Sequence, residues 1–327
     1  MVELTVVVPT YNRRDILEEA LERLARQETH SSFEVVVVDD GSTDGSAEAV
    51  RAFAKRAPVA VTVLEQPNSG SGAARNRGSA AAQGYVCLFL GDDMWARPDL
   101  VERHSAFHRG QDGDEVALLG GVVWSPDCRP SPLMEWLASE GVQFGFGQIW
   151  SREGLPPNFF YTANISVKTR FLRANGGFHE AFRHFTDIDL GLRLHRAGMR
   201  LDYDPEAIVE HFHPTELPGS LERARRLGYW ARLLIERNPE WPIPRRPGSR
   251  HRLKAAALTA LNKARIRTRP VQTETWRFLF HEAYREGYWG VPAADAQPVR
   301  IGAMLARFAA GDPATRIGKT PSGDLPH

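Results

Sequence analysis

Runs of apolar residues that end abruptly in polar clusters dominate the first third of the chain. The central run, Tyr85–Leu90, has no polar alternation and stops at Gly91, Asp92 and Asp93. Such a run is typical of a strand buried on both faces of a sheet. Three similar runs precede it: Leu4–Pro9, Glu34–Val38 and Val59–Leu64.

Segments in which apolar residues recur at helical spacing separate these runs. The first begins at a capping-box-like pair, Asp15 and Glu18. The next two are expected over Ser46–Lys55 and, after a flexible turn that ends at Gly72, through Ala73, Arg75, Arg77 and Ala80. Strands that alternate with helices over short loops predict an α/β fold. Its central sheet should be mostly parallel, with right-handed crossovers and flanking helices.

The pattern beyond Pro98 is more varied. It predicts a helix to about His108 and a short helix over Asp187–Ala197. Four further strands are predicted: Val116–Val123, Asn164–Val167, Arg200–Tyr203 and Ala207–Val209. From about Leu217 it predicts helices only: Leu221–Arg237, His251–Ala264, Thr273–Glu286 and Val299–Ala309. We therefore predict an α/β domain over residues 1–214, a basic helical region over 215–311 and a flexible tail over 312–327.

Polar clusters follow each of the first four predicted strands. They are Thr10–Asn12, Asp39–Asp40, Asn68–Gly72 and Asp92–Asp93. The carboxyl ends of parallel strands meet at one edge of a sheet, which is where open α/β sheets bind ligands. Packing alone does not require this concurrence, so the sequence predicts a binding site at that edge.

The adjacent carboxylates Asp92 and Asp93 allow a structural and a functional interpretation. A surface turn, or a cap for the helix near Pro98, is the structural one. In the functional one, Asp93 binds a hard divalent cation that bridges a diphosphate, and Asp92 accepts hydrogen bonds from ribose hydroxyls. The cation would then act as a Lewis acid on the leaving diphosphate.

Further residues could complete a nucleotide site at the same edge. Tyr11 could stack on a nucleobase, and Asp40 could accept a hydrogen bond from a base imide N–H. Arg75 lies one turn into the helix after a Gly-rich turn, where it could reach a phosphate. A solvated charge on the helix surface is the alternative for Arg75.

Two histidines and one aspartate are the remaining candidates. His211 follows a late strand and is the candidate second metal ligand, with His213 as second choice. Local hydrogen bonding at a strand end is the alternative for either histidine. Asp187 is the candidate general base, because an acceptor hydroxyl needs a positioned carboxylate to take its proton. A helix N-terminal aspartate favoured by the helix dipole is the alternative, a part that Asp189 could also play.

Residues 133–161 are rich in aromatic side chains. They are Trp136, Phe144, Phe146, Trp150, Phe159, Phe160 and Tyr161. A helix and loop that pack over the core would use them as buried area. A mobile lid or an acceptor platform would use their faces to stack on a ring.

Charge is distributed unevenly, although the net charge is only +1. Residues 1–214 hold 21 basic and 30 acidic residues, whereas residues 215–327 hold 20 and 10. The two cysteines do not suggest a disulfide framework. The N-terminus enters a strand directly and no apolar segment reaches the roughly 20 residues of a membrane span. These features predict a cytoplasmic protein.

Seven motifs of this sequence resemble, in order, those of the inverting family 2 glycosyltransferases. They are Val-Val-Val-Pro-Thr-Tyr-Asn-Arg (6–13), Val-Val-Asp-Asp-Gly-Ser-Thr-Asp (37–44), Gly-Ser-Gly-Ala-Ala-Arg-Asn-Arg-Gly (70–78), Phe-Leu-Gly-Asp-Asp (89–93), Gly-Gly-Phe (176–178), Thr-Asp-Ile-Asp-Leu-Gly-Leu-Arg-Leu (186–194) and Val-Glu-His-Phe-His (209–213). The resemblance covers residues 3–214 and implies the GT-A fold over this catalytic domain.

The resemblance also implies a reaction and the residues for it. Its nucleotide-sugar site would consist of Pro9, Tyr11, Asp40, Arg75 and Asp92. Asp93 and His211 would bind Mn2+ or Mg2+, and Asp187 would be the base. A sugar would pass from a nucleoside-diphosphate donor, UDP- or dTDP-linked, to an acceptor hydroxyl in one in-line displacement that inverts configuration. Two positions depart from the family: Gly91 replaces a frequent Asp, and Thr186 replaces the Glu of a common Glu-Asp pair.

The region beyond the resemblance is strongly basic. Residues 223–269 hold 14 Lys and Arg against two acids, Glu236 and Glu240. They could pack on the catalytic domain or contact an anionic membrane at the inner face, which would suit a lipid-linked acceptor. A glycan or a small molecule is an equally open acceptor, and no nucleic acid is expected. Two rival functions are a nucleotidyltransferase, for which the phosphate loop after the first strand is missing, and a non-catalytic nucleotide-sugar-binding or scaffold protein.

Overall fold

The computed structural model describes residues 2–239, 249–264 and 268–289. The chain divides into two units at Pro214, the first of residues 1–130 and 137–214, the second of residues 131–136 together with those after 214. The predicted helix Val299–Ala309 and the predicted tail lie outside the described residues.

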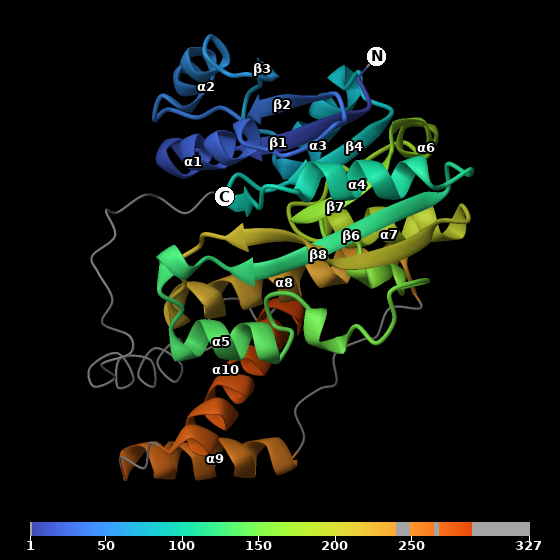
Figure 1. Ribbon diagram of the computed structural model, residues 1–327. Helices are drawn as coiled ribbons and strands as arrows, with labels where there is room; N and C mark the ends of the chain where they lie inside the picture. Colours follow the sequence, from blue (N-terminus) through green and yellow to red (C-terminus); the bar gives the residue numbers. More distant parts are fainter. Residues whose placement is uncertain (1, 240–248, 265–267, 290–327) are drawn as a thin grey trace. The chain divides into compact units, whose positions relative to one another are not determined.

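An eight-stranded sheet forms the centre of the first unit, in the order β3-β2-β1-β4-β7-β6-β8-β5 (Figure 1). Its strands are β1 Leu4–Thr10, β2 Phe33–Asp39, β3 Ala60–Glu65, β4 Val86–Leu90, β5 Met94–Ala96, β6 Val116–Trp124, β7 Asn164–Lys168 and β8 Arg200–His211. The first four strands pair in parallel, as predicted. The sheet as a whole is mixed, because β7 runs antiparallel to both β4 and β6.

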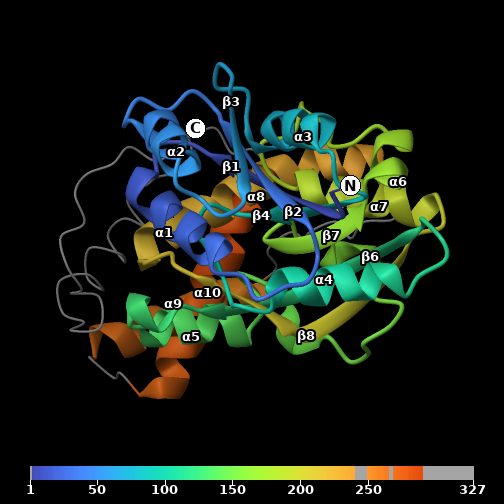
Figure 2. The same cartoon turned by 45° about the horizontal axis from the view of Figure 1, so that its top comes forward.

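Helices cover both faces of this sheet. They are α1 Arg14–Ala25, α2 Ser46–Ala54, α3 Ser71–Ala81, α4 Leu100–Arg109, α6 Thr169–Ala174 and α7 Thr186–Arg196. Leucines of α1 share one core cluster with Val6 and Val8 of β1, whereas Val7 belongs to a second cluster with residues of α6 and α7. In Figure 2, α1 and α2 lie on one side of strands β1–β3 and α3 on the other. Because successive side chains alternate between faces, an uninterrupted valine run fills both cores.

Two local predictions were wrong. The predicted strands Arg200–Tyr203 and Ala207–Val209 are one strand, β8, whose pairing with β6 shifts register at Gly120/Gly121. A bulge can interrupt the side-chain alternation without ending a strand. Helix α1 has no side-chain cap of its own, and the backbone N–H of Arg14 instead donates to Asp44 at 3.0 Å. Asp44 also accepts from the backbone and hydroxyl of Ser46, so one carboxylate serves the starts of two helices.

The described part of the second unit is helical. It includes α8 Leu217–Arg237, α9 Ser249–Lys263 and α10 Arg269–Trp289, and the start of α5 Pro132–Ser139 also belongs to it. Trp136 of α5 contacts Trp276 and Phe280 of α10. Among the described helices, none is both long and apolar enough to span a bilayer.

Helices α8 and α10 approach closely through two glycines, Gly228 and Gly287. A Cβ atom at either position would overlap backbone atoms of the facing helix. We therefore expect Gly228→Ala to lower the free energy of unfolding by about 1–3 kcal/mol, the usual cost of overpacking. Thermal unfolding followed by circular dichroism measures the effect. Gly219→Ala in α8 is the matched control, because its Cβ would meet no atom within 4 Å; equal melting temperatures for the two variants would contradict this packing.

Candidate active site

The ends of β1 and β4 meet at one edge of the sheet. The hydroxyl of Thr10, the last residue of β1, donates to Asp92 Oδ2 at 2.9 Å. Asp92 and Asp93 follow β4 and are both buried. The parallel pairing of β1 with β4 produces this contact, since it places the two carboxyl ends side by side.

A short antiparallel pairing, absent from the sequence predictions, places Asp93 beside the two histidines. Met94 of β5 lies opposite His211 of β8, and the N–H of Phe212 donates to the Asp93 carbonyl at 2.8 Å. Because side chains alternate along extended backbone, His211 and His213 point to the same side. Phe212 points to the other side and stacks on Trp95, with ring centroids 4.3 Å apart.

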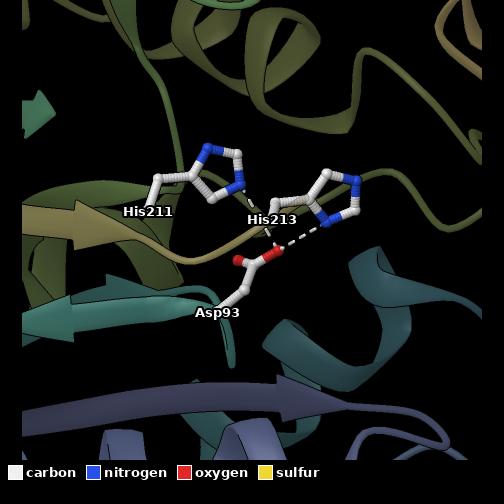
Figure 3. A group of neighbouring side chains, drawn as sticks. All are labelled: Asp93, His211 and His213. Carbon is white, nitrogen blue, oxygen red and sulfur yellow. Dashed lines mark ion pairs between the residues drawn. The ribbon is translucent and has the colours of Figure 1, made fainter. Parts of the chain in front are cut away.

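Asp93, His211 and His213 form a cluster that could hold a metal ion (Figure 3). Asp93 Oδ2 lies 3.5 Å from both His211 Nε2 and His213 Nδ1. One potential ligand atom from each residue lies within 4.8 Å of the other two. The sequence treated His213 as an alternative to His211, whereas the structure brings both to the same carboxylate.

The surroundings of His211 disfavour protonation of its imidazole. Its ring is buried and stacked between Trp124 and His213, with centroids at 4.8 and 5.4 Å. Burial lowers the pKa of His211, although Asp93 partly opposes this. A neutral imidazole has a free nitrogen lone pair, which metal ligation requires.

Arg13, which the sequence analysis did not single out, supplies the positive charge at this cluster. Its Nη1 donates to Asp93 Oδ2 at 2.6 Å and to Asp92 Oδ1 at 3.2 Å. Its Nη2 lies 3.4 Å from His213 Nδ1. Burial acts to lower the pKa of Arg13, but the two carboxylates outweigh it and raise the pKa. Two adjacent buried carboxylates require a nearby cation, and that requirement is the signal that could have identified Arg13.

The two aspartates differ in their affinity for protons. Burial raises the pKa of Asp92 to about 6, a shift that Arg13 opposes and the neighbouring Asp93 reinforces. Burial would raise the pKa of Asp93 as well, but His211, His213 and Arg13 hold it well below the usual value. Asp93 is therefore the carboxylate that stays ionised, as a metal ligand must.

Asp40 organises the loop between β3 and α3. Its Oδ1 accepts from the Gln66 side chain at 2.7 Å and from the N–H of Ser69 at 2.8 Å, and its Oδ2 accepts from the N–H of Gly70 at 2.8 Å. A carboxylate oxygen can accept two hydrogen bonds, so Oδ2 retains capacity for another donor. Pro9 and Tyr11, at the end of β1, are both half-buried.

Arg75 and Asp187 interact electrostatically across the site. Arg75 lies in α3 with its guanidinium 5.7 Å from the centroid of the Phe178 ring. Within the described residues, its Nε is buried without a hydrogen-bond partner. Burial lowers the pKa of Arg75, while Asp187, Asp92 and Asp93 oppose that effect. Arg75 is therefore not the solvated surface charge that was its alternative interpretation.

Asp187 is the second residue of α7 and has the features of a general base. Burial raises its pKa, and the charge of Arg75 is the largest opposing influence. One oxygen accepts from the N–H of Ile188 at 2.9 Å. The residue at the helix start, Phe185, has φ 62°, a left-handed conformation that is costly for a bulky residue.

Asp189 has a structural role instead. It is buried and pairs with Arg193 at 3.0 Å. Arg193 also donates to the carbonyls of Asn175 and Gly177, at 2.9 and 2.6 Å. This network fixes α7 to the loop before it.

Apart from the exposed Trp150, the aromatic residues of 133–161 also divide into two groups. Trp136, Phe159 and Phe160 are buried. Phe144 and Tyr161 are half-buried and pack together, and the ring of Phe144 also contacts His211 edge-on at 5.8 Å. The first group fits the packing interpretation, whereas the second borders the candidate metal cluster.

Comparisons with known proteins identify the family. The family model "Glycosyl transferase family 2" matches residues 5–172. Validoxylamine A glucosyltransferase of Streptomyces hygroscopicus subsp. jinggangensis is 33% identical over 229 residues, covering 62% of this chain and 54% of that protein. Hyaluronan synthase of Pasteurella multocida is 27% identical over 226 residues, covering 60% of this chain and 23% of that protein. The chain thus spans about half the length, or less, of these relatives.

Solved structures support the fold. The mannosyltransferase PcManGT of Pyrobaculum calidifontis, in complex with GDP-Man and Mn2+, superposes with a TM-score of 0.59 at 21% identity, covering 89% of this chain and 88% of that one. Staphylococcus aureus TarS in complex with UDP-GlcNAc gives 0.52 at 18% identity, covering 88% and 91%. The chain belongs to glycosyl transferase family 2 and has a GT-A-type fold.

Proposed function

We propose that this glycosyltransferase moves a sugar from a nucleoside-diphosphate donor to an acceptor hydroxyl by a metal-dependent, inverting displacement. The observation that carries the proposal is the concentration of charged groups at one sheet edge. Asp93 and the two histidines lie there, and the positive charge of Arg75 interacts with both Asp93 and Asp187. A non-catalytic sugar-nucleotide binder would not need a half-buried carboxylate of raised pKa at this place.

The donor would bind along the strand ends. Pro9, Tyr11 and the remaining acceptor capacity of Asp40 would hold the nucleobase, and Asp92 would accept from the ribose hydroxyls. Arg75 would donate to the diphosphate, since its Nε is buried without a partner among the described residues.

The residues of the cluster fit a divalent transition-metal ion. Asp93, His211 and His213 offer one carboxylate oxygen and two imidazole nitrogens. Magnesium favours all-oxygen coordination, so this donor set favours Mn2+ over Mg2+. When bound, such an ion would neutralise the charge that develops on the leaving diphosphate.

Asp187 would take the proton from the acceptor hydroxyl as that oxygen attacks the anomeric carbon. A raised pKa makes it a stronger base than an exposed aspartate, and its negative charge is held by Arg75. The bond to the diphosphate breaks on the opposite face of the sugar, so the configuration inverts. Holding both substrates in one cleft contributes much of the rate enhancement.

The names of the relatives do not agree on one donor nucleotide or one acceptor, so both must be determined by experiment. The relative named for glucosyl transfer supports a glucosyl donor, and TarS supports uridine. The complex of PcManGT with GDP-Man adds guanosine to the UDP and dTDP expected from the sequence. A glycan, a lipid-linked sugar or a small molecule would be the acceptor.

Peripheral contact of residues 223–269 with an anionic membrane remains part of this proposal. In the described part of that segment, Arg225 pairs with Glu222 and Glu286, and Lys254 pairs with Glu274 at 2.7 Å. Internal pairing reduces the charge available to lipid. Sedimentation with vesicles of phosphatidylglycerol, against vesicles of phosphatidylcholine, tests the contact, and equal sedimentation would remove it.

Proton NMR of donor turnover tests the proposed reaction. The enzyme with Mn2+ is mixed with α-linked UDP-glucose, dTDP-glucose or GDP-mannose, and the anomeric signals are followed from the first minutes. The proposal predicts that the β-anomer appears first, whether the sugar passes to water or to an added glycoside. First appearance of the α-anomer would contradict inversion, and turnover unaffected by chelation with EDTA would contradict metal dependence.

Gly91 offers a test of the metal cluster that leaves every ligand in place. A Cβ at this position would lie 2.8 Å from Asp93 Oδ1 and 3.2 Å from Met94 Cγ. We expect Gly91→Ala to turn the Asp93 carboxylate and weaken Mn2+ binding by about 10–100-fold, the usual effect of misorienting a ligand. Calorimetric titration measures it. Gly110→Ala is the control, because its Cβ would meet carbonyl oxygens at an ordinary 3.5 Å; an unchanged affinity in Gly91→Ala would show that Asp93 is not a ligand.

A further inference from the structure

Arg13 contacts the atoms that a metal ion would need. Its Nη1 lies 2.6 Å from Asp93 Oδ2, and its Nη2 lies 3.4 Å from His213 Nδ1. These are the atoms through which Asp93 and His213 face each other in the candidate metal cluster. Divalent ions bind such atoms at about 2.0–2.6 Å, so an ion there would occupy the space of the guanidinium. Arg13 and the metal therefore exclude one another at these atoms.

The charges lead to the same conclusion. Arg13 contacts both buried carboxylates, Asp92 and Asp93, and so supplies the cation that they need when no metal is bound. A divalent ion at Asp93 would repel the guanidinium. The nearest alternative partner in the proposed reaction is the donor diphosphate, because guanidinium groups bind phosphate oxygens in a bidentate manner.

The backbone around Arg13 is fixed, which leaves its side chain as the movable part. The N–H of Asn12 donates to Ser42 Oγ at 2.9 Å, and Asn12 Oδ1 accepts from the N–H of Thr43 at 2.8 Å. On the other side, the N–H of Arg14 donates to Asp44. The Arg13 side chain is 26% exposed, so rotation of the side chain alone can carry the guanidinium away from the carboxylates.

We infer that Arg13 competes with the metal for Asp93 and His213. The metal binds fully only when a diphosphate draws the Arg13 guanidinium away. Metal and donor binding are then coupled through one side chain. This inference rests on the proposed function, since it assumes that the cluster binds a metal. It assigns Arg13 two successive partners: the two carboxylates before the metal binds, and the diphosphate afterwards.

Calorimetric titration of Mn2+ into the apoprotein tests the inference without any turnover. Arg13→Gln removes the competing charge, and Arg13→Lys keeps a charge but loses the forked geometry that reaches three partners at once. We expect the affinity for Mn2+ alone to rise from wild type through Arg13→Lys to Arg13→Gln, by roughly tenfold or more overall, within the usual range of coupling between sites. Arg14→Gln is the control, since Arg14 is exposed and pairs with Glu18.

Repeating the titrations with saturating UDP, GDP or dTDP separates the possible outcomes. The diphosphate that binds should tighten Mn2+ binding more in wild type than in Arg13→Gln, because only wild type has a competitor to remove. An affinity for Mn2+ alone that does not rise in either Arg13 variant overturns the inference but leaves the metal site. Absence of Mn2+ binding in every protein, with and without diphosphate, overturns the proposed metal site and the inference together.

Discussion

Replacing Asp187 with asparagine is expected to lower kcat by about 10²–10⁴-fold, the usual contribution of general acid–base catalysis. Asparagine keeps the size of the side chain and can still accept from the N–H of Ile188, so α7 should begin as before. It cannot take a proton from the acceptor. Donor binding should change little, because Asp187 makes no proposed contact with the nucleotide.

The pH dependence of kcat, measured for wild type and Asp187→Asn, distinguishes a general base from a residue with a structural role. Asp187 acts as a base only when ionised, and burial raises its pKa above the usual range of aspartate. The kcat of wild type should therefore fall as the pH falls through this raised pKa, and that acidic limb should be missing in Asp187→Asn. Asp189→Asn, which breaks the pair with Arg193, is the control and should lower thermal stability instead. A mutant of Asp187 with wild-type kcat would remove it from the base role.

Asp93→Asn carries the second large expected effect. The substitution removes the carboxylate that faces both histidines and leaves the shape of the side chain intact. Metal ions contribute several kcal/mol to stabilising developing charge, so we expect kcat to fall by about 10²–10³-fold or more. Mn2+ affinity, measured by calorimetry, should fall in parallel.

Asp114, in the loop between α4 and β6, provides the comparison for Asp93. Asp114 pairs with Arg170 and accepts a hydrogen bond from the Tyr85 hydroxyl at 3.2 Å, and it is not part of the candidate metal cluster. Asp114→Asn should therefore bind Mn2+ as wild type does. An Asp93→Asn enzyme that retained both Mn2+ affinity and turnover would place the metal elsewhere or remove it from the reaction.

The sequence was sufficient to predict the strands and helices whose apolar pattern is local. Valine runs such as those of β1 and β2 can be satisfied only by burial on both faces, so a mostly parallel sheet could be expected. The structure adds the order of its first four strands, β3-β2-β1-β4. The convergence of Asp92 with the end of β1 follows from that order, and the Thr10–Asp92 hydrogen bond realises it.

The remaining features depend on pairings between distant segments. Strand β5 has three residues, and only its pairing with β8 holds it in extended form. Without that pairing, the sequence could not show that His211 and His213 both face Asp93. Arg13 escaped notice for the same reason, because its partners are 79 to 200 residues away.

Polar residues after strands also serve structure as often as chemistry. Asp44 belongs to a motif that resembles the family, yet it caps α1 and α2. Asp40 holds the loop of Ser69 and Gly70 and keeps capacity for a ligand on one oxygen. Both are aspartates of one motif after β2, so only the three-dimensional hydrogen bonds distinguish their roles.

The most direct test of a metal-dependent donor site is calorimetric titration of UDP, dTDP and GDP into wild type and Asp93→Asn, each with Mn2+ and with EDTA. We expect that at least one diphosphate binds wild type tightly with Mn2+, and that chelation and the Asp93→Asn substitution each weaken this binding. Binding that is equally tight under all four conditions, or absent from wild type with Mn2+ for every diphosphate, would contradict it.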